Sequence, residues 1–224
     1  MSFARHAHGG QPPRSQPPVN LPRAVGYLIA VNAAVYVLQV AMPWRWTNWI
    51  VTHLGFVPAR YVGSPAGWDL WAFISPITHQ FLHGGGVHIL VNMVMLAAFG
   101  SGVARTLGSR RMLAMYLIAG VAGALAHWIA YPADTAPVVG ASGAISGLFG
   151  MVLRLLARHP HGGGLTRIWP VALIWIGIAA LTGIGGMPGT EGARVAWAAH
   201  IGGFAVGFLA FDLALIGFKP WQVK

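Results

Sequence analysis

Cysteine is absent from this chain of 224 residues, which excludes disulfides, thiolate catalysis and thiolate-bound metals. Charged residues are also scarce. They make up 8% of the sequence, against about 25% in an ordinary soluble domain, and only four of them are acidic. Hydrophobic residues reach 56%, which is too high for a disordered chain. The composition therefore indicates a polytopic membrane protein built as one compact domain.

Apolar segments long enough to cross a bilayer occur six times. A transmembrane helix needs about 20 mostly apolar residues. The segments that meet this need cover residues 24–42, 87–103, 112–130, 138–157, 168–185 and 195–218. We therefore predict an all-α fold with six transmembrane helices in a membrane domain at 23–218. A disordered cytoplasmic tail at 1–22 would precede it, and a short cytoplasmic C-terminus at 219–224 would follow.

The first segment between spans, residues 43–82, is long and contains five tryptophans. Tryptophan favours the interface between membrane and water. We therefore expect short helices here that lie partly in the outer leaflet.

The net charge of +10 comes from basic residues that are spread in short groups between the apolar segments. With a cytoplasmic N-terminus, eleven Lys and Arg residues fall on the cytoplasmic side and three on the outer side. This is the bias that the positive-inside rule predicts. We therefore expect the lipid bilayer, and no nucleic acid, as a partner. The compact chain favours the inner membrane of a bacterium, with both termini in the cytoplasm.

Four polar residues inside the predicted spans fall at a similar depth: His88, Asn92, Ser142 and His200. Such residues are costly in a membrane, so each is a candidate functional residue. At a rise of about 1.5 Å per residue, all four lie in the outer third of the bilayer. His88 and Asn92 are four residues apart and share one helix face. From there both can donate hydrogen bonds to a developing negative charge.

The segment before Ser142, residues 132–140, contains two prolines and ends in glycine, which predicts irregular backbone. Irregular backbone at membrane depth is tolerated where it lines a cavity or is buried in protein. We therefore expect a helix to begin at Ser142. Its positive N-terminal end would face a cavity that opens to the outer side.

Small residues would let the fourth and sixth spans approach closely, because both carry a glycine pair at four-residue spacing. The pairs are Gly143 with Gly147 and Gly203 with Gly207. Ser142 and His200 flank these faces, so the packing makes a hydrogen-bonded pair plausible.

Three of these candidates also have a structural interpretation. Ser142 could pack as a small residue, His200 could be a structural hydrogen-bonding residue, and Asn92 could bond between helices. His127, near the outer end of the third span, has no evident partner and is interpreted as structural.

A metal site is the weakest alternative. It would draw on loosely spaced histidines at 79, 83 and 88, and the sequence contains no His-Glu-x-x-His motif. We expect neither a metal nor a cofactor.

No acidic residue is placed to complete a catalytic triad. Asp69 and Asp134 fall in outside loops, Glu191 precedes the sixth span, and Asp212 lies twelve residues after His200. We therefore infer a Ser–His dyad in which the histidine acts first as general base and then as general acid.

Three blocks of the sequence resemble those of the rhomboid intramembrane serine proteases. Residues 83–93 (HGGGVHILVNM) are similar to the family's His-x4-His-x3-Asn block at the start of its second span. Residues 140–143 (GASG) match the serine motif that opens its fourth span. Residues 199–203 (AHIGG), followed by Gly207, resemble its sixth-span histidine block. The order of the blocks, the spans and the topology agree from about residue 24 to 218.

The resemblance implies a rhomboid-like bundle with Ser142 as nucleophile and His200 as base. It also implies an oxyanion hole formed by His88, Asn92 and the backbone N–H of Ser142. The substrates would be single-span membrane proteins, cut in or near the transmembrane segment at a helix-destabilising site. The fifth span and the loop at 185–194 would act as gate and cap.

Two positions depart from the family pattern. The family often has a Trp-Arg pair in the first outside loop, whereas here Trp44-Arg45 comes early and Trp71 is followed by alanine. The family also commonly places an aromatic residue four positions after the serine, where this chain has Ser146. We expect the Ser146 hydroxyl to hold His200 in place of a stacked ring.

Two other functions compete with proteolysis. A non-catalytic relative that binds transmembrane segments need not keep both Ser142 and His200. A transporter or channel should carry interrupted helices paired between two halves, and only the fourth span has this character. An intramembrane serine protease is therefore the favoured interpretation.

Overall fold

The computed structural model describes residues 21–63, 68–159, 163–185, 196–214 and 216. Within these ranges the chain is helical, and the only extended pairing is an isolated bridge between Phe56 and Val138. The predicted all-α class is confirmed. Residues 1–20 of the proposed tail at 1–22 lie outside the described ranges. The proposed C-terminus at 219–224 also lies outside them.

Among the described residues, three helical stretches are long and apolar enough to cross a membrane by length and composition. The first is α1 (Arg23–Ala41) and the third is α6 (Ser109–Ala130). The second runs from Gly86 to Leu107 and is made of α4 (Gly86–Met95), a π-helical turn η4 (Leu96–Gly100) and α5 (Ser101–Leu107). They fall on the first three predicted spans.

The last four helices along the chain are α7 (Ser142–Arg158), α8 (Gly164–Gly185), α9 (Trp197–Leu209) and the short α10 (Phe211–Ala214). α7, α8 and α9 fall on the last three predicted spans. The predicted sixth span is wrong in one respect, because its helix ends at Leu209 instead of running to residue 218. The chain turns at Ala210, and this turn brings the Asp212 carboxylate to Arg154 and Arg158 of α7, 2.8 and 2.7 Å away.

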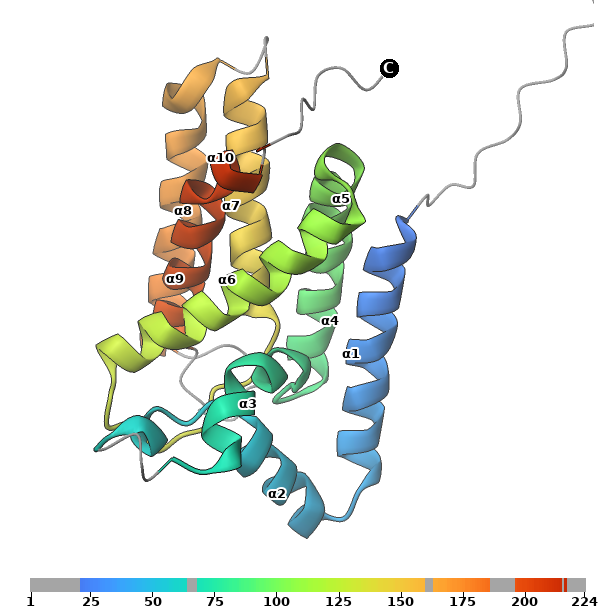
Figure 1. Ribbon diagram of the computed structural model, residues 1–224, viewed down its shortest axis with the longest axis vertical. Helices are drawn as coiled ribbons and strands as arrows, with labels where there is room; N and C mark the ends of the chain where they lie inside the picture. Colours follow the sequence, from blue (N-terminus) through green and yellow to red (C-terminus); the bar gives the residue numbers. More distant parts are fainter. Residues whose placement is uncertain (1–20, 64–67, 160–162, 186–195, 215, 217–224) are drawn as a thin grey trace, which may run out of the picture.

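The helices form a bundle in which α7 packs against both α9 and α6, and α8 lies beside them (Figure 1). α1 and α4 stand on the other side, and α6 crosses obliquely between the two groups. The core fills the space between α1, η4, α6 and α7. Its largest fully buried side chains include Tyr116, Leu96, Ile145, Leu148 and Met151.

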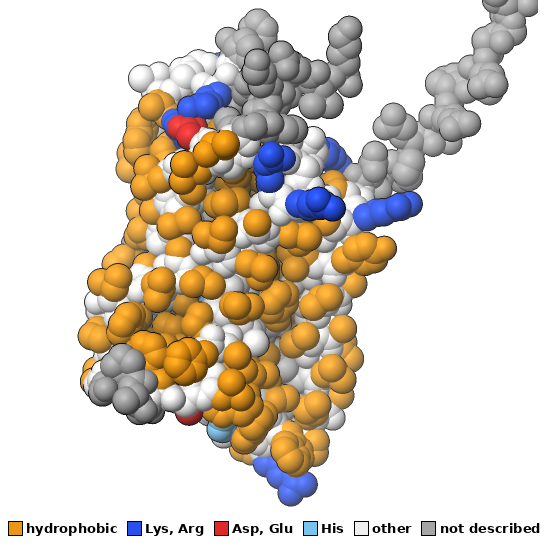
Figure 2. All heavy atoms as spheres, in the orientation of Figure 1, with side chains coloured by type: hydrophobic (Ala, Val, Ile, Leu, Met, Phe, Trp, Pro, Cys, Tyr) orange, Lys and Arg blue, Asp and Glu red, His pale blue; other side chains and the backbone are white. Residues whose placement is uncertain are grey.

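The surface has the polarity of a membrane protein. Figure 2 shows hydrophobic side chains over the middle of one face, and Arg side chains gathered near the end at which α1 begins. Of the nine arginines in the described ranges, seven belong to helix ends at this side of the bundle: Arg23, Arg105, Arg110, Arg111, Arg154, Arg158 and Arg167. Only Arg45 and Arg60 lie at the opposite end.

The segment at 43–82 folds into short helices, as predicted, at the end of the bundle opposite the seven grouped arginines. They are α2 (Trp44–Leu54), the 3-10 turn η1 (Pro58–Tyr61), α3 (Leu70–Thr78) and the 3-10 turn η3 (His79–Phe81). Trp44 is 77% exposed, Trp46 47% and Trp49 40%, which suits rings that rest in the interface.

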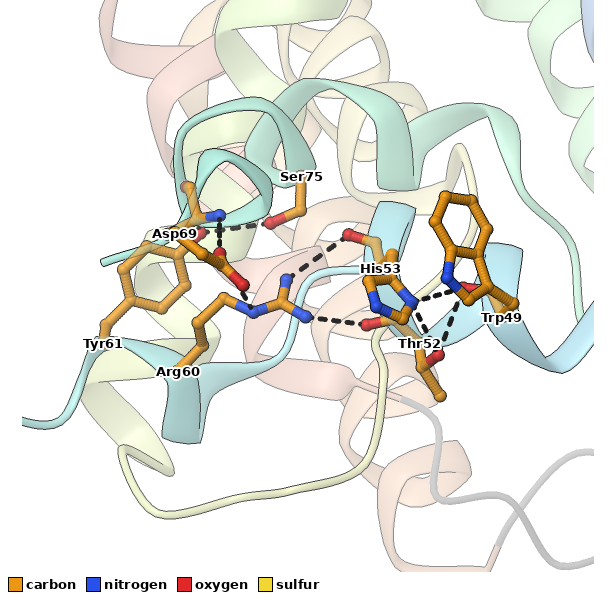
Figure 3. Close-up of polar contacts among 8 residues, drawn as sticks. Trp49, Thr52, His53, Arg60, Tyr61, Asp69 and Ser75 are labelled. Carbon is orange, nitrogen blue, oxygen red and sulfur yellow. Dashed lines mark hydrogen bonds and ion pairs between the residues drawn. The ribbon is translucent and has the colours of Figure 1, made fainter. Parts of the chain in front are cut away.

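Arg60 joins two of these short helices (Figure 3). Its guanidinium donates to the carbonyl oxygens of Thr52 and His53 at the end of α2, at 2.8 and 3.3 Å. Its Nε lies 3.8 Å from Asp69, whose carboxylate accepts the Ala72 N–H and so caps the start of α3. The loop therefore has an arginine brace although Trp71 is followed by alanine and not by the arginine of the family's Trp-Arg pair.

Tyr61 anchors α3 to the same loop. Its hydroxyl donates to the carbonyl of Ala72 at 2.6 Å and lies 3.2 Å from Ser75 Oγ (Figure 3). Burial raises the pKa of this phenol, so it stays a neutral donor at physiological pH.

Candidate functional site

Helix α7 begins at Ser142, as the sequence predicts, because the backbone before it is held in a non-helical path. Val138 exchanges two hydrogen bonds with Phe56, at 2.8 and 3.0 Å. Gly140 donates its N–H to the carbonyl of His79 at 2.9 Å and has a φ of +125°, which L side chains rarely adopt. Ser142 therefore opens a helix whose first N–H groups have no acceptor within the helix.

The structure brings Ser142 and His200 together from two helices. Ser142 Oγ lies 2.8 Å from His200 Nε2, and both residues are half-buried. With the His200 proton on Nδ1, Nε2 accepts the hydrogen bond from the hydroxyl. Among the described residues, no carboxylate lies within ion-pair distance of His200. The arrangement is a serine–histidine pair in which the imidazole can take the hydroxyl proton.

Close packing of α7 on α9 makes this pair possible, and the four glycines at 143, 147, 203 and 207 line the contact. A Cβ on Gly203 would overlap the carbonyl oxygen of Gly143. A Cβ on Gly207 would overlap the carbonyl oxygen of Gly147. The two backbones therefore touch directly along the turns that follow Ser142 and His200.

His88 and Asn92 lie beside the backbone that leads into Ser142. A Cβ on Gly140 would stand 2.8 Å from His88 Nε2 and 3.8 Å from Asn92 Nδ2. Asn92 is only 5% exposed, and its amide nitrogen has no hydrogen-bond partner among the described residues. A buried donor without a partner is costly unless something else completes it. Both side chains can thus donate to an anion formed beside Ser142.

The expected role of the Ser146 hydroxyl is wrong. Ser146 is fully buried, and its Oγ donates to the carbonyl of Ser142 at 2.8 Å instead of holding His200. A serine inside a helix readily donates to the carbonyl four residues earlier, and Ser146 forms this local bond and not one to His200.

The expectation that His127 has no partner is also wrong. Its Nε2 lies 3.5 Å from Asp134 Oδ2, at ion-pair distance but without hydrogen-bond geometry. The turn after α6 returns Asp134 to the helix end, where its N–H bonds to the carbonyl of Tyr131. The Tyr131 hydroxyl accepts from Trp197 Nε1 at 2.9 Å, which ties the C-terminal end of α6 to the start of α9.

Two further buried residues lie near the site, of which Gln39 was assigned no role from the sequence and His83 was considered only for the metal alternative and as part of the family's histidine block. Gln39 of α1 is 4% exposed and bonds to the backbone of His83. The ring of His83 is itself buried and meets the ring of His88 edge-on, with centroids 5.2 Å apart. The available signal was the interruption of the apolar first span by Gln39. The expected cap at 185–194 lies outside the described residues apart from Gly185, the last residue of α8.

Comparison with known proteins places the chain in a family. Residues 67–216 match the model of the Rhomboid domain. RHOMBOID-like protein 4 and RHOMBOID-like protein 5 of Arabidopsis thaliana are each 34% identical to the chain, over 70% and 66% of its length. Rhomboid protease AarA of Providencia stuartii is 30% identical over 81% of the chain. The matched part spans 36%, 45% and 69% of these three relatives.

The match covers most of the bundle, including the helices that carry His88, Asn92, Ser142 and His200. Rhomboid proteins are helical polytopic membrane bundles and are generally intramembrane serine proteases. Three membrane-length helices and the shorter apolar helices of this chain agree with that architecture. The chain therefore belongs to the rhomboid family.

Proposed function

We propose that this chain is an intramembrane serine endopeptidase that cuts the transmembrane segments of single-span membrane proteins. One observation carries the proposal, namely the 2.8 Å contact between Ser142 Oγ and His200 Nε2 at the start of α7. A non-catalytic binding protein has no need of a hydroxyl and an imidazole at this distance.

The reaction would proceed in two halves. Ser142 Oγ attacks the scissile carbonyl while His200 Nε2 takes its proton, and the carbonyl oxygen becomes an oxyanion. His200 then gives the proton to the leaving amine, which releases the C-terminal product and leaves an acyl-enzyme. A water molecule, deprotonated by His200, attacks the ester, and the proton returns to Ser142 as the acid product leaves.

His88, Asn92 and the backbone N–H of Ser142 would stabilise the oxyanion. The helix N-terminus adds its positive dipole end at the same place. The unpartnered Asn92 amide supports this role, because a substrate oxygen would complete its hydrogen bond. No cofactor or metal takes part in this scheme.

The site would open toward the outer side of the membrane. The end of the bundle rich in arginine would face the cytoplasm, since seven of the nine described arginines lie there. Both termini would then be cytoplasmic, and the dyad would lie toward the outer end of α9. A bacterial inner membrane fits this arrangement, as the match to the bacterial protease AarA suggests.

The test is cleavage of a single-span reporter protein by the purified chain in lipid vesicles. Ser142→Ala and His200→Ala should each lower turnover by more than about 1,000-fold, because each removes one member of a unit that acts together. Ser101→Ala is the matched control, since Ser101 is a buried serine of α5 whose hydroxyl has no partner among the described residues. Wild-type turnover by a folded Ser142→Ala protein would reject the proposal. Reporter binding without cleavage by the wild type would favour the non-catalytic alternative.

A further inference from the structure

Gln39 is a buried polar side chain of α1 that the proposed reaction does not use. Both ends of its amide bond to a single residue of another segment. The His83 N–H donates to Gln39 Oε1 at 3.1 Å, and Gln39 Nε2 donates to the His83 carbonyl at 3.4 Å. Two bonds to one residue fix both its place and its rotation, so the turn before α4 is tied to α1.

The residue after His83 makes the next contact. Gly84 donates its backbone N–H to Nδ1 of His88 at 3.4 Å. A neutral imidazole carries one proton, and a ring nitrogen that accepts a hydrogen bond must be the one without it. The His88 proton is therefore placed on Nε2 whenever this bond is formed.

Nε2 is the nitrogen of His88 that faces the site. It is among the atoms that a Cβ on Gly140 would meet at 2.8 Å, two residues before Ser142. The ring of His83 packs edge-on against the His88 ring, with an angle of 68° between the planes, and so limits its rotation. The same short turn therefore governs both the tautomer and the orientation of His88.

We propose that Gln39 is a positioning residue for the oxyanion hole. By holding the backbone of His83, it presents the Gly84 N–H to His88 Nδ1 and keeps a protonated Nε2 directed at the reacting carbonyl oxygen. This inference rests on the proposed role of His88 as an oxyanion donor. It extends the site to α1, which contributes no reacting group.

The test reads the tautomer of His88 directly, independently of turnover. Nitrogen-15 spectra of the folded, histidine-labelled protein in detergent distinguish a protonated ring nitrogen from a bare one. The His88 signals are identified by their loss in His88→Gln. We expect a single tautomer with a protonated Nε2 in the wild type and a mixture in Gln39→Met. The same variant should lower kcat by about 10-fold or more, a part of what one lost oxyanion donor costs, with KM within about two-fold.

Asn32→Leu is the matched control. Asn32 is also a buried amide of α1, but its side chain donates to the Leu28 carbonyl of its own helix at 2.8 Å. This variant should leave the His88 tautomer and kcat unchanged. A Gln39→Glu variant keeps the acceptor for the His83 N–H and should fall between wild type and Gln39→Met.

An unchanged His88 tautomer in any folded Gln39 variant would overturn the proposal. If Gln39→Met does not fold, Gln39→Glu decides the matter. If neither folds while Asn32→Leu does, Gln39 serves folding alone and the proposal is also overturned. A tautomer that depends on Gln39 in a protein that cleaves nothing would uphold the link and reject the proposed function. Cleavage by a protein whose His88 tautomer does not depend on Gln39 would support the proposed function and overturn the proposed role of Gln39.

Discussion

Replacing Gly203 by alanine should separate Ser142 from His200. The added Cβ would overlap the carbonyl oxygen of Gly143 and lie 3.2 Å from that of Ala119. Ordinary carbon–oxygen contacts of this kind are about 3.3–3.6 Å long. Because both obstacles are backbone atoms of neighbouring helices, no side chain can rotate away. We expect α9 to move off α7 by roughly 1 Å or more.

A shift of this size would break the contact between Ser142 and His200. The present distance of 2.8 Å would become about 3.8 Å, which is beyond hydrogen-bond reach. A misplacement of about 1 Å at a catalytic group costs on the order of 100-fold in rate. Overpacking of this kind costs about 1–3 kcal/mol in stability, so a folded fraction should remain for measurement.

The assay is reporter cleavage in vesicles beside thermal unfolding in detergent. Gly26→Ala is the matched control, because Gly26 is a glycine inside α1 whose added Cβ would meet nothing closer than Leu21 at 3.6 Å. It should keep turnover within about two-fold of wild type and gain slightly in helix propensity. A folded Gly203→Ala protein with wild-type turnover would refute the idea that direct backbone contact sets the dyad distance.

Three further substitutions make independent predictions. Asn92→Ala should lower kcat by about 10- to 1,000-fold with little change in KM, as expected for the loss of one oxyanion donor. Unfolding of this variant in detergent would instead show that Asn92 serves as a hydrogen-bonding residue between helices. Arg60→Ala removes the donors to the Thr52 and His53 carbonyls. The loss should lower the free energy of unfolding by about 1–3 kcal/mol and the unfolding temperature by several degrees. An unchanged unfolding temperature would show that these bonds do not contribute to stability. Burial lowers the pKa of His79, in the segment between α1 and α4, to about 4. In the unfolded chain the His79 imidazole takes up a proton near pH 6.5, whereas in the folded protein it does so only near pH 4. The free energy of unfolding should therefore decline as the pH falls from 6.5 to 4. An equal decline in His79→Gln would show that His79 is not the group responsible.

The start of α7 at Ser142 could be predicted because its causes are local. Prolines and glycines before the serine rule out a continuous helix, and a positive φ at Gly140 fits a residue without a Cβ. The closeness of Ser142 and His200 followed from two independent patterns, their common depth and the glycine faces on both helices. The depth of a residue in its span and the four-residue spacing of glycines can both be read from a single sequence.

The contacts that were missed depend on where the chain returns in space. The partner of His127 comes from a turn that brings Asp134 back to the end of α6. Gln39 reaches across 44 residues to the backbone of His83, and no spacing rule relates the two. The same holds for Arg60, which bonds to the carbonyl oxygens of Thr52 and His53 at the end of α2.

The early end of the sixth helix shows how tertiary contacts override an apolar run. Residues 195–218 are apolar almost throughout, and hydropathy alone predicts one continuous span. Asp212 is the exception, and its carboxylate is bound by Arg154 and Arg158 of α7 after the turn at Ala210. Hydropathy could not give the turn, because the two arginines belong to a different span.

Labelling with a fluorophosphonate probe tests the central claim most directly. The probe reacts with a serine only when a neighbouring base activates its hydroxyl. The purified protein in detergent would be compared with Ser142→Ala and His200→Ala, with a known serine protease labelled alongside. We predict labelling of the wild type and of neither variant, because the hydroxyl and the imidazole act as a pair at 2.8 Å. A folded wild-type protein that stays unlabelled, or a His200→Ala protein that labels as fast as wild type, would contradict an activated serine at this site.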